Sequence, residues 1–486
     1  MNETGAAAAR SGLLLLAALI ALSLFAFGLH AFPVPSSDSH AFLPPALLLE
    51  AGQGLRNPTS ELTRRLDSSG QARYLQYPPL FQLVLALLMP GPTPRAAFLA
   101  IAGINALNAF LSALLFARAA GLSARPPSRA AALAACGATL GIATLLVGQQ
   151  TGRPEALATL WVLLSAHLHL SLPPEKAWIP AGLLLGLLGA THPMGGLILG
   201  LLTAVLYGTR TPAGRAFAAT AGTLALSLAV FAAILAAAPH GLWETLEGLR
   251  RHARITVVER TSWASLVPYW ITGSGATFYG ISYLLLAGAL AARAIRGKAL
   301  LPLKPLLLAA LSLLGIVIWR VGLRLPELSY NLLLFAPLVF AANLRWSPLP
   351  ATLLAHALAA AGYLRFLVLF GFFLAQGTPL AEARDAFRRH LPASGRVGVT
   401  PSLWAVSEEY DRMTAFPLAE GAAGLDADVL LVQQNYSGLL APPELAGFRL
   451  VEDRFIPHPC RLLGVKVANT VPGYAYAVYR RTPERR

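Results

Sequence analysis

The residues best suited to chemistry stand where long apolar segments end. Asp38 closes the stretch Pro33–Asp38 after the first apolar segment, and Arg153-Pro154-Glu155 opens a later one. A carboxylate at such a boundary can accept a proton from a hydroxyl group, and an arginine can bind a phosphate through paired hydrogen bonds. The alternatives are a solvated aspartate beside a helix end, and a helix N-terminus that Pro154 and Glu155 stabilise.

Other ionisable residues share this position at helix ends. His192 lies in Thr191-His192-Pro193 between two apolar segments, where a structural histidine is the alternative to a ligand. Arg320 and Arg324 follow a late apolar segment, on the side where the positive-inside rule expects few arginines. Arginines on that side need an anionic partner, and lipid phosphate is the natural one.

The elements that must position these residues are membrane-spanning helices. Of 486 residues, 56% are hydrophobic and 13% are charged, about half of the roughly 25% charged residues in soluble domains. Repeated apolar runs predict a mainly α-helical, polytopic transmembrane bundle with about eleven crossings. Gly12–Phe32 is expected to be a retained first helix, and Pro79–Met89 is too short to span and is expected to be partial or interfacial.

The basic residues orient the bundle. They concentrate between apolar runs, so the net charge of +15 indicates cytoplasmic anchoring and anionic lipids as partners, and no nucleic acid. With the N-terminus inside, the first long loop (33–79) and the second (239–274) face outward. The helix ends that carry Asp38, Arg153, His192 and Arg324 then meet on the extracytoplasmic side, and the charges from Arg56 to Asp67 are expected to be solvated surface.

The chain divides into two predicted domains. Residues 1–375 form the transmembrane domain, in which Trp243–Val258 is expected to be an interfacial amphipathic helix. Residues 376–486, with 13 Lys and Arg against 12 Asp and Glu, have a soluble α/β pattern and form a small extracytoplasmic domain. Its predicted elements are a helix, Leu380–His390, and four strands, Arg396–Thr400, Ala427–Val432, Phe448–Phe455 and Tyr474–Tyr479.

Several short motifs occur in a defined order along the chain. They are Asp38 after the first helix, Tyr77-Pro78-Pro79-Leu80-Phe81, Arg153-Pro154-Glu155, Thr191-His192-Pro193, a late segment with Arg324, Tyr330 and Pro337, and the strand Ala427–Val432. The pattern resembles the GT-C superfamily of membrane glycosyltransferases that use polyprenyl-phosphate sugars, in the branch of protein O-mannosyltransferases and lipid A aminoarabinose transferases. It departs from many relatives in having Asp38-Ser39 where they have paired acids, and His192 where a lysine is common.

The resemblance implies an enzyme that transfers a hexose or pentose from a polyprenyl-phosphate donor to a hydroxyl of a glycan, lipid or protein. Asp38 would be the general base, and Arg153, Arg320 and Arg324 would bind the lipid phosphate. Tyr77, Glu155, His192 and Tyr330 would complete the binding site. No cofactor is implied with certainty; a divalent metal cation, where one is used, would be held by Asp38 and Glu155.

Two other functions stay open. A transporter or flippase for a lipid-linked anion would place charges near mid-helix and repeat broken helices in two halves, whereas polar residues here collect at helix ends. A non-catalytic membrane assembly protein would use the tail to recruit a partner. The sequence contains no glycine-rich phosphate loop, which argues against a nucleotide-activated substrate.

Overall fold

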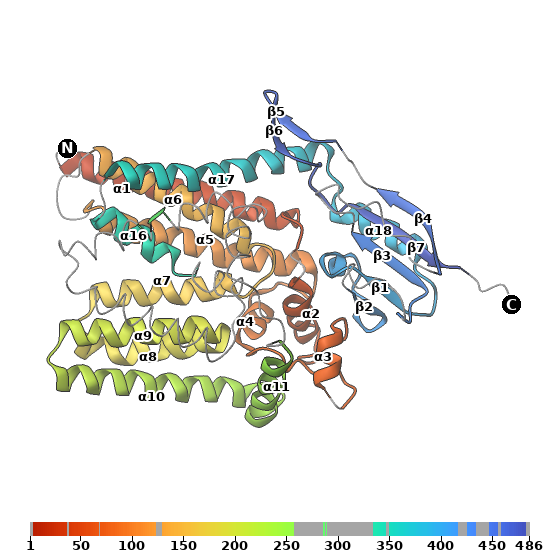
Figure 1. Cartoon of the computed structure of the whole chain (residues 1–486), viewed down its shortest axis with the longest axis horizontal. Coiled ribbons are helices and arrows are strands. Elements are labelled where there is room, and N and C mark those ends of the chain that lie inside the picture. Colours follow the sequence, from red (N-terminus) through yellow and green to blue (C-terminus); the bar gives the residue numbers. More distant parts are fainter. Residues whose placement is uncertain are drawn as a thin grey trace.

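The computed structural model describes residues 3–35, 38–67, 69–122, 129–256, 285–286, 288, 334–346, 349–416, 425–433, 447–454 and 458–482. Within these ranges the chain is mainly helical and has a small sheet in its C-terminal part, as the sequence predicts. Long helices lie side by side in a bundle, and the sheet lies at one end of that bundle (Figure 1).

The bundle is built from apolar helices. They are α1 (Glu3–Leu29), α5 (Pro94–Ala119), α6 (Arg129–Gln149), α7 (Glu155–Ser171), α8 (Pro174–Thr191), α9 (Pro193–Arg210), α10 (Ala213–Ala237), α16 (Ala336–Trp346) and α17 (Leu349–Gln376). Among the described residues, α1, α5, α6, α10 and α17 contain stretches long and apolar enough to cross a membrane. The predicted count of eleven crossings stays a prediction, since residues 289–333 lie outside the described ranges.

The first long loop is not irregular chain. Residues 33–79 contain α2 (Ser39–Glu50) and α3 (Glu61–Leu66), and α4 (Leu80–Leu88) follows. Seven consecutive apolar residues bury α2 in the interior although it contains two prolines. Helix α4 has nine residues, which gives about 13 Å at 1.5 Å per residue. It is therefore too short to cross a bilayer, as expected for this segment.

The C-terminal part contains the predicted helix and the four predicted strands, together with further strands that the sequence did not predict. Helix α18 (Leu380–His390) packs beside a five-stranded sheet of order β2-β1-β3-β7-β4. Strand β1 is parallel to β2 and β3, and β7 is antiparallel to β3 and β4. The strands are β1 (Val397–Val399), β2 (Met413–Ala415), β3 (Val429–Gln433), β4 (Phe448–Arg454) and β7 (Tyr476–Arg481), and a separate hairpin consists of β5 (Cys460–Leu462) and β6 (Val465–Ala468).

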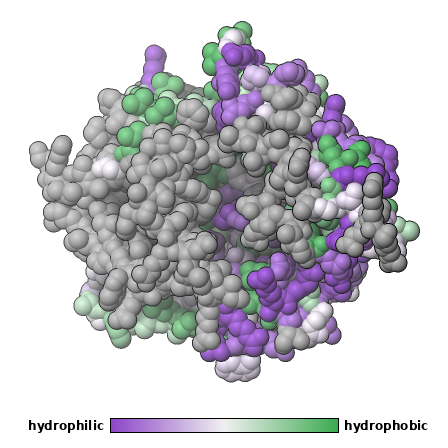
Figure 2. All heavy atoms as spheres, turned by 45° about the vertical axis from the view of Figure 1, so that its right-hand side comes forward, coloured by the Kyte–Doolittle hydropathy of each residue, from purple (hydrophilic) through white to green (hydrophobic). Residues whose placement is uncertain are grey.

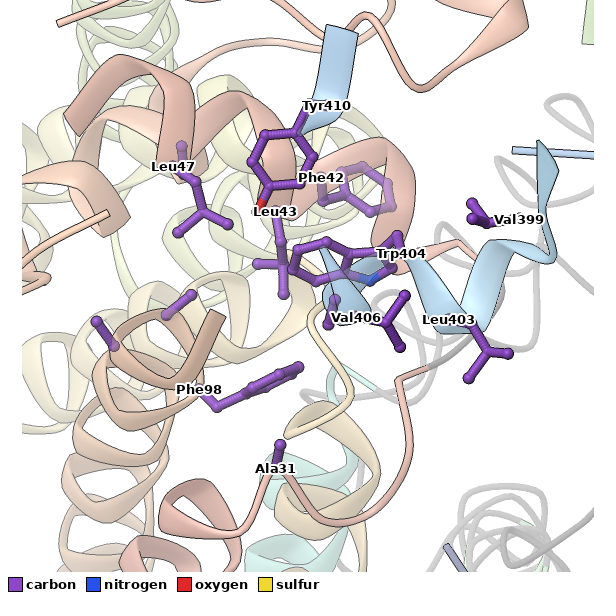
Figure 3. Packing of buried hydrophobic residues seen from close by; sticks show 14 of the residues in the cluster. Ala31, Phe42, Leu43, Leu47, Phe98, Val399, Leu403, Trp404, Val406 and Tyr410 are labelled. Carbon is purple, nitrogen blue, oxygen red and sulfur yellow. The ribbon is translucent and has the colours of Figure 1, made fainter. Parts of the chain in front are cut away.

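The bundle and the C-terminal part share one hydrophobic core. The short 3-10 helix η2 (Pro401–Val406) inserts Trp404 between Leu43 of α2 and Phe98 of α5 (Figure 3). The Trp404 indole is fully buried, and its Nε1 donates a hydrogen bond to Ser39 Oγ at 2.7 Å. Burial of such a side chain stabilises a fold by about 2–3 kcal/mol, so this contact fixes the C-terminal part against the start of α2.

The expectation that the charges from Arg56 to Asp67 are solvated surface holds for Glu61, Arg64 and Arg65, which are exposed. It is wrong for Asp67, which is buried, and for Arg56, which is half-buried. Arg56 forms an ion pair with Asp411, and Arg64 donates to Thr414 at 3.0 Å. The Asp67 side chain is 0% exposed and pairs with Arg73 at 3.0 Å. These charges join the first loop to its neighbours, because the loop folds back under the C-terminal part instead of extending into water.

Helix α11 (Gly241–Thr256) corresponds to the predicted amphipathic helix. It lies at the same end of the bundle as α2, α3 and α4 (Figure 1). Gly248 permits a close approach, since a Cβ there would lie 2.4 Å from Leu75 Cβ. The second loop thus packs directly on the return of the first, just before Tyr77.

Candidate functional site

Arg153 connects two carboxylates that the sequence places far apart from each other. Its Nη1 donates to Asp38 Oδ2 at 2.7 Å, and its Nη2 lies 2.8 Å from Glu155 Oε1. The Asp38 side chain is 54% exposed, whereas that of Glu155 is 8% exposed. The cluster therefore has one carboxylate that faces outward and one that faces the interior, with a single guanidinium shared between them.

Local backbone geometry explains why Arg153 reaches Asp38. Asp38 is the residue just before α2, and its side chain makes no capping hydrogen bond to that helix. Gly152, with φ +98°, precedes Arg153, and a Cβ there would lie 2.6 Å from Leu43 Cδ1 and 3.1 Å from Ser39 Cβ. Only glycine combines this conformation with so close an approach, so Gly152 lets the chain before α7 lie on the first turn of α2.

A network of buried amide side chains holds the chain between α6 and α7 against α5. Gln150 Nε2 donates to the Phe98 carbonyl at 2.6 Å, and Asn105 Nδ2 donates to Gln150 Oε1 at 3.3 Å. Asn108, one turn further along α5, donates to the Ala156 carbonyl at 2.8 Å. Sequence reasoning missed these residues; the signal was the pair of amides three residues apart in an otherwise apolar helix.

The cluster has hydrogen-bonding capacity left over. Glu155 Oε2 is buried and has no hydrogen-bond partner among the described residues. Among the described residues, Asp38 accepts a side-chain hydrogen bond on Oδ2 and none on Oδ1. Buried carboxylate oxygens are normally hydrogen-bonded, so the free oxygens are places where a proton donor of another molecule can bind.

His192 belongs to the same neighbourhood. It lies between α8 and α9, and its Nδ1 accepts a hydrogen bond from the Gly195 N–H at 3.1 Å. An accepting Nδ1 places the proton of a neutral imidazole on Nε2, which is then a donor. Burial, the largest influence, lowers the pKa of His192, while the charges of Glu155 and Arg153 act on it in opposite directions.

Tyr77 lies at the junction of α2 and α11. Its ring is 4.8 Å from the ring of Phe42 and 4.8 Å from that of His252. The structure thus brings together Asp38, Arg153, Glu155 and His192, while Tyr77 packs with a neighbouring pair of helices. The predicted site residues Arg320, Arg324 and Tyr330 lie outside the described residues.

The two carboxylates do not fit a metal site as they are arranged. Arg153 is bonded to both of them, so its guanidinium takes the position that a divalent cation would need. Within the described ranges, no group of three His, Cys, Asp or Glu residues could hold an ion.

The described part of this end of the molecule is rich in hydrophilic side chains, as Figure 2 shows from that side. No protein-family model and no curated protein sequence matches the chain. Two solved structures are similar to it. One is the arabinofuranosyltransferase AftD from Mycobacteria, with a TM-score of 0.46 and 16% identity, over 98% of this chain and 40% of that one.

The other is an Archaeoglobus fulgidus oligosaccharyltransferase in complex with Zn and sulfate. Its TM-score is 0.45 at 13% identity, over 87% of this chain and 68% of that one. Likeness of this degree assigns neither substrates nor site residues.

Proposed function

We propose that this protein is a membrane glycosyltransferase that moves a sugar from a polyprenyl-phosphate donor to an acceptor hydroxyl. The observation that carries the proposal is the cluster of Asp38, Arg153 and Glu155. A half-exposed carboxylate, a shared guanidinium and a buried carboxylate meet at one end of a bundle of apolar helices. Such a position gives access both to a lipid-borne donor and to an acceptor from water, on the extracytoplasmic side by the positive-inside rule.

Asp38 is the general base of this mechanism. Its Oδ2 is held by Arg153, which leaves Oδ1 to accept the proton of the acceptor hydroxyl. The acceptor oxygen forms a bond to the anomeric carbon while the bond from that carbon to the phosphate oxygen breaks. The electron pair leaves with the polyprenyl phosphate, so no ATP or other co-reactant is needed.

The cations stabilise the departing phosphate. Arg153 has five N–H donors, and its bonds to the two carboxylates use three of them, on Nε, Nη1 and Nη2. Glu155 keeps the guanidinium plane fixed through its Oε1. The neutral His192 offers an Nε2–H donor nearby, and Arg320 and Arg324 complete the positive charge that the phosphate needs. Tyr77 and Tyr330 are assigned to donor binding. Preorganised donors of this kind stabilise charge that develops in the transition state.

The test uses membranes that contain the full chain and a panel of polyprenyl-phosphate hexoses and pentoses with labelled sugars. The Asp38→Asn variant should lose transfer by about 100-fold or more, the usual contribution of a general base. Glu61→Gln is the matched control, since the Glu61 side chain is 52% exposed and its ion pair among the described residues is with Arg65 one turn away. Full transfer by the Asp38→Asn variant would overturn the proposal.

The same vesicles test the rival functions. A transporter would move the labelled lipid across the bilayer with its bond from sugar to phosphate intact. An assembly protein would neither move nor cleave it. Appearance of free polyprenyl phosphate together with a labelled acceptor supports transfer.

A further inference from the structure

The hairpin of β5 and β6 stands apart from the main sheet. Among the strands that the structure describes, β5 and β6 pair only with each other, and Figure 1 shows the hairpin projecting beside the end of α17. Leu463 and Gly464 turn the chain with φ values of 49° and 82°, the left-handed conformations of a tight two-residue turn. Arg461 Nη1 donates to the Gly464 carbonyl at 3.1 Å and closes this turn.

The base of the hairpin is attached to a helix that can cross a membrane. Arg365 of α17 donates from Nε to the Val467 carbonyl at 3.0 Å. Val467 and Ala468 pack on a hydrophobic cluster of α1 and α17 that includes Phe373. Both helices contain candidate membrane spans, Ala7–Leu29 and Thr352–Gln376.

The hairpin is attached to α17 close to the level of the end of α1. Ser23 Oγ and Tyr363 OH are 2.6 Å apart, which aligns α17 with a point six residues before the end of α1 at Leu29. At 1.5 Å per residue this point lies about 9 Å below the end of α1. Arg365 and the base of the hairpin therefore lie within about 9 Å of the end of the α1 span at Leu29. On α17, Arg365 lies 11 residues before the end of the candidate span at Gln376, so the hairpin is attached beside the outer half of both helices.

The tip of the hairpin is apolar and uncovered. Leu463 is 96% exposed, Val465 66% and Leu462 45%. Arg461 and Lys466 flank these residues and are exposed as well. An apolar tip between two cations is the arrangement of interfacial membrane segments, in which apolar groups enter the lipid and cations bind the head groups.

We propose that the β5–β6 hairpin is an interfacial membrane anchor. Leu462, Leu463 and Val465 insert among the lipids beside α17, and Arg461 and Lys466 bind lipid phosphates. The hairpin thereby fixes the height and tilt of the C-terminal part above the bilayer. The inference depends on the position of the hairpin beside membrane-spanning helices and not on sugar transfer, so it stands or falls separately from the proposed function.

The test measures lipid exposure of the tip in the full chain reconstituted into vesicles of phosphatidylcholine and phosphatidylglycerol. A nitroxide label is attached to L463C, or to L450C as the matched control, in a background of Cys136→Ser and Cys460→Ala. Leu450 lies on the edge strand β4 and is 47% exposed. We expect the ratio of oxygen accessibility to nickel-chelate accessibility to be several-fold higher at position 463 than at position 450.

Two results would overturn the anchor. One is an equal ratio at both positions, which would place the tip in water. The other is a label at 463 that is immobile and shielded from both reagents, which would mean that protein covers the tip.

The charges are tested with the label at 463 and the double variant R461Q/K466Q. In the parent chain, the label at position 463 should lie deeper in vesicles with phosphatidylglycerol than in vesicles of phosphatidylcholine alone. In the double variant this difference in depth should be lost. An unchanged difference in the double variant would contradict binding of lipid phosphates by Arg461 and Lys466.

Discussion

Two clusters in this protein have the same composition, an arginine between two carboxylates. They differ in how many hydrogen bonds the buried carboxylate accepts. Arg73 joins Asp67 of the first loop to Glu244 of α11, and Arg153 joins Asp38 to Glu155. In the first cluster the Asp67 side chain is 0% exposed and accepts hydrogen bonds from Ser69 as well as Arg73.

The second cluster is left incomplete. Glu155 Oε2 has no partner among the described residues, and the Asp38 side chain is half exposed. The difference lies in the buried carboxylates, since both oxygens of Asp67 are bonded and one oxygen of Glu155 is not. A buried carboxylate with both oxygens bonded connects two segments, whereas one with a free oxygen can bind a proton donor of a substrate. Composition alone therefore does not separate a structural cluster from a catalytic one.

The largest difference between the two clusters is expected in the rate of sugar transfer when the aspartate of each cluster is replaced. Asp38→Asn should reduce sugar transfer by about 100-fold or more because it removes the proposed general base. Asp67→Asn should leave the rate of the folded fraction nearly unchanged. Initial rates in reconstituted vesicles, normalised to folded protein by size-exclusion chromatography, measure the difference. Equal losses in both variants would remove the distinction between the clusters.

Replacement of the shared arginines should have the next largest effect. Arg153→Lys keeps the charge but cannot bond both carboxylates in one plane. Loss of one charge-assisted hydrogen bond costs about 1.5–3 kcal/mol, which corresponds to roughly a 10- to 150-fold slower transfer. The matched variant Arg73→Lys should retain most of the rate, as measured by the same assay. A slower Arg73→Lys variant with an unaffected Arg153→Lys variant would reverse the assignment.

The free energy of unfolding should change in the opposite order, more for Asp67→Asn than for Asp38→Asn. Asp67→Asn leaves Arg73 without its buried charge partner and should lower the free energy of unfolding by about 1–3 kcal/mol. Asp38→Asn should change it by less, since its side chain is exposed and exposed ion pairs contribute about 0–1 kcal/mol. Thermal unfolding in detergent, followed by intrinsic fluorescence, compares the two variants. A lower midpoint for Asp38→Asn than for Asp67→Asn would contradict the structural role of the Asp67 cluster.

The smallest effect is a pH dependence of that stability difference. Burial alone would raise the pKa of Asp67, but the hydrogen bonds from Arg73 and Ser69 lower it to about 2 from an ordinary value of 3.8. Because the pKa of the folded form is the lower one, the ionised carboxylate stabilises the fold above pH 3.8, and this contribution is lost as the pH falls toward 2.

The difference in midpoint between the parent chain and Asp67→Asn should therefore be full at pH 6 and smaller at pH 3. Glu61→Gln controls for the general effect of acid on exposed carboxylates. A difference that stays constant over this range would show that Asp67 does not titrate with a lowered pKa.

The sequence by itself predicted the elements that depend on local patterns. Long apolar runs predicted the bundle helices, a short buried-type apolar run predicted β3, alternation predicted β7, and the amphipathic pattern predicted α11. It also marked Asp38, Arg153, Glu155 and His192, because charged residues at the ends of apolar helices are costly unless they have partners. These features depend on neighbours within a few residues of each other.

Only the tertiary structure decided which charges meet. Asp38 and Arg153 are 115 positions apart, and their contact depends on the close approach of Gly152 to α2. In the same way, Asp67 became buried because α11 and the C-terminal part cover the first loop. The local sequence around a charged loop residue is the same whether water or a folded segment surrounds its side chain. The packing of distant segments determines which of these surroundings it has.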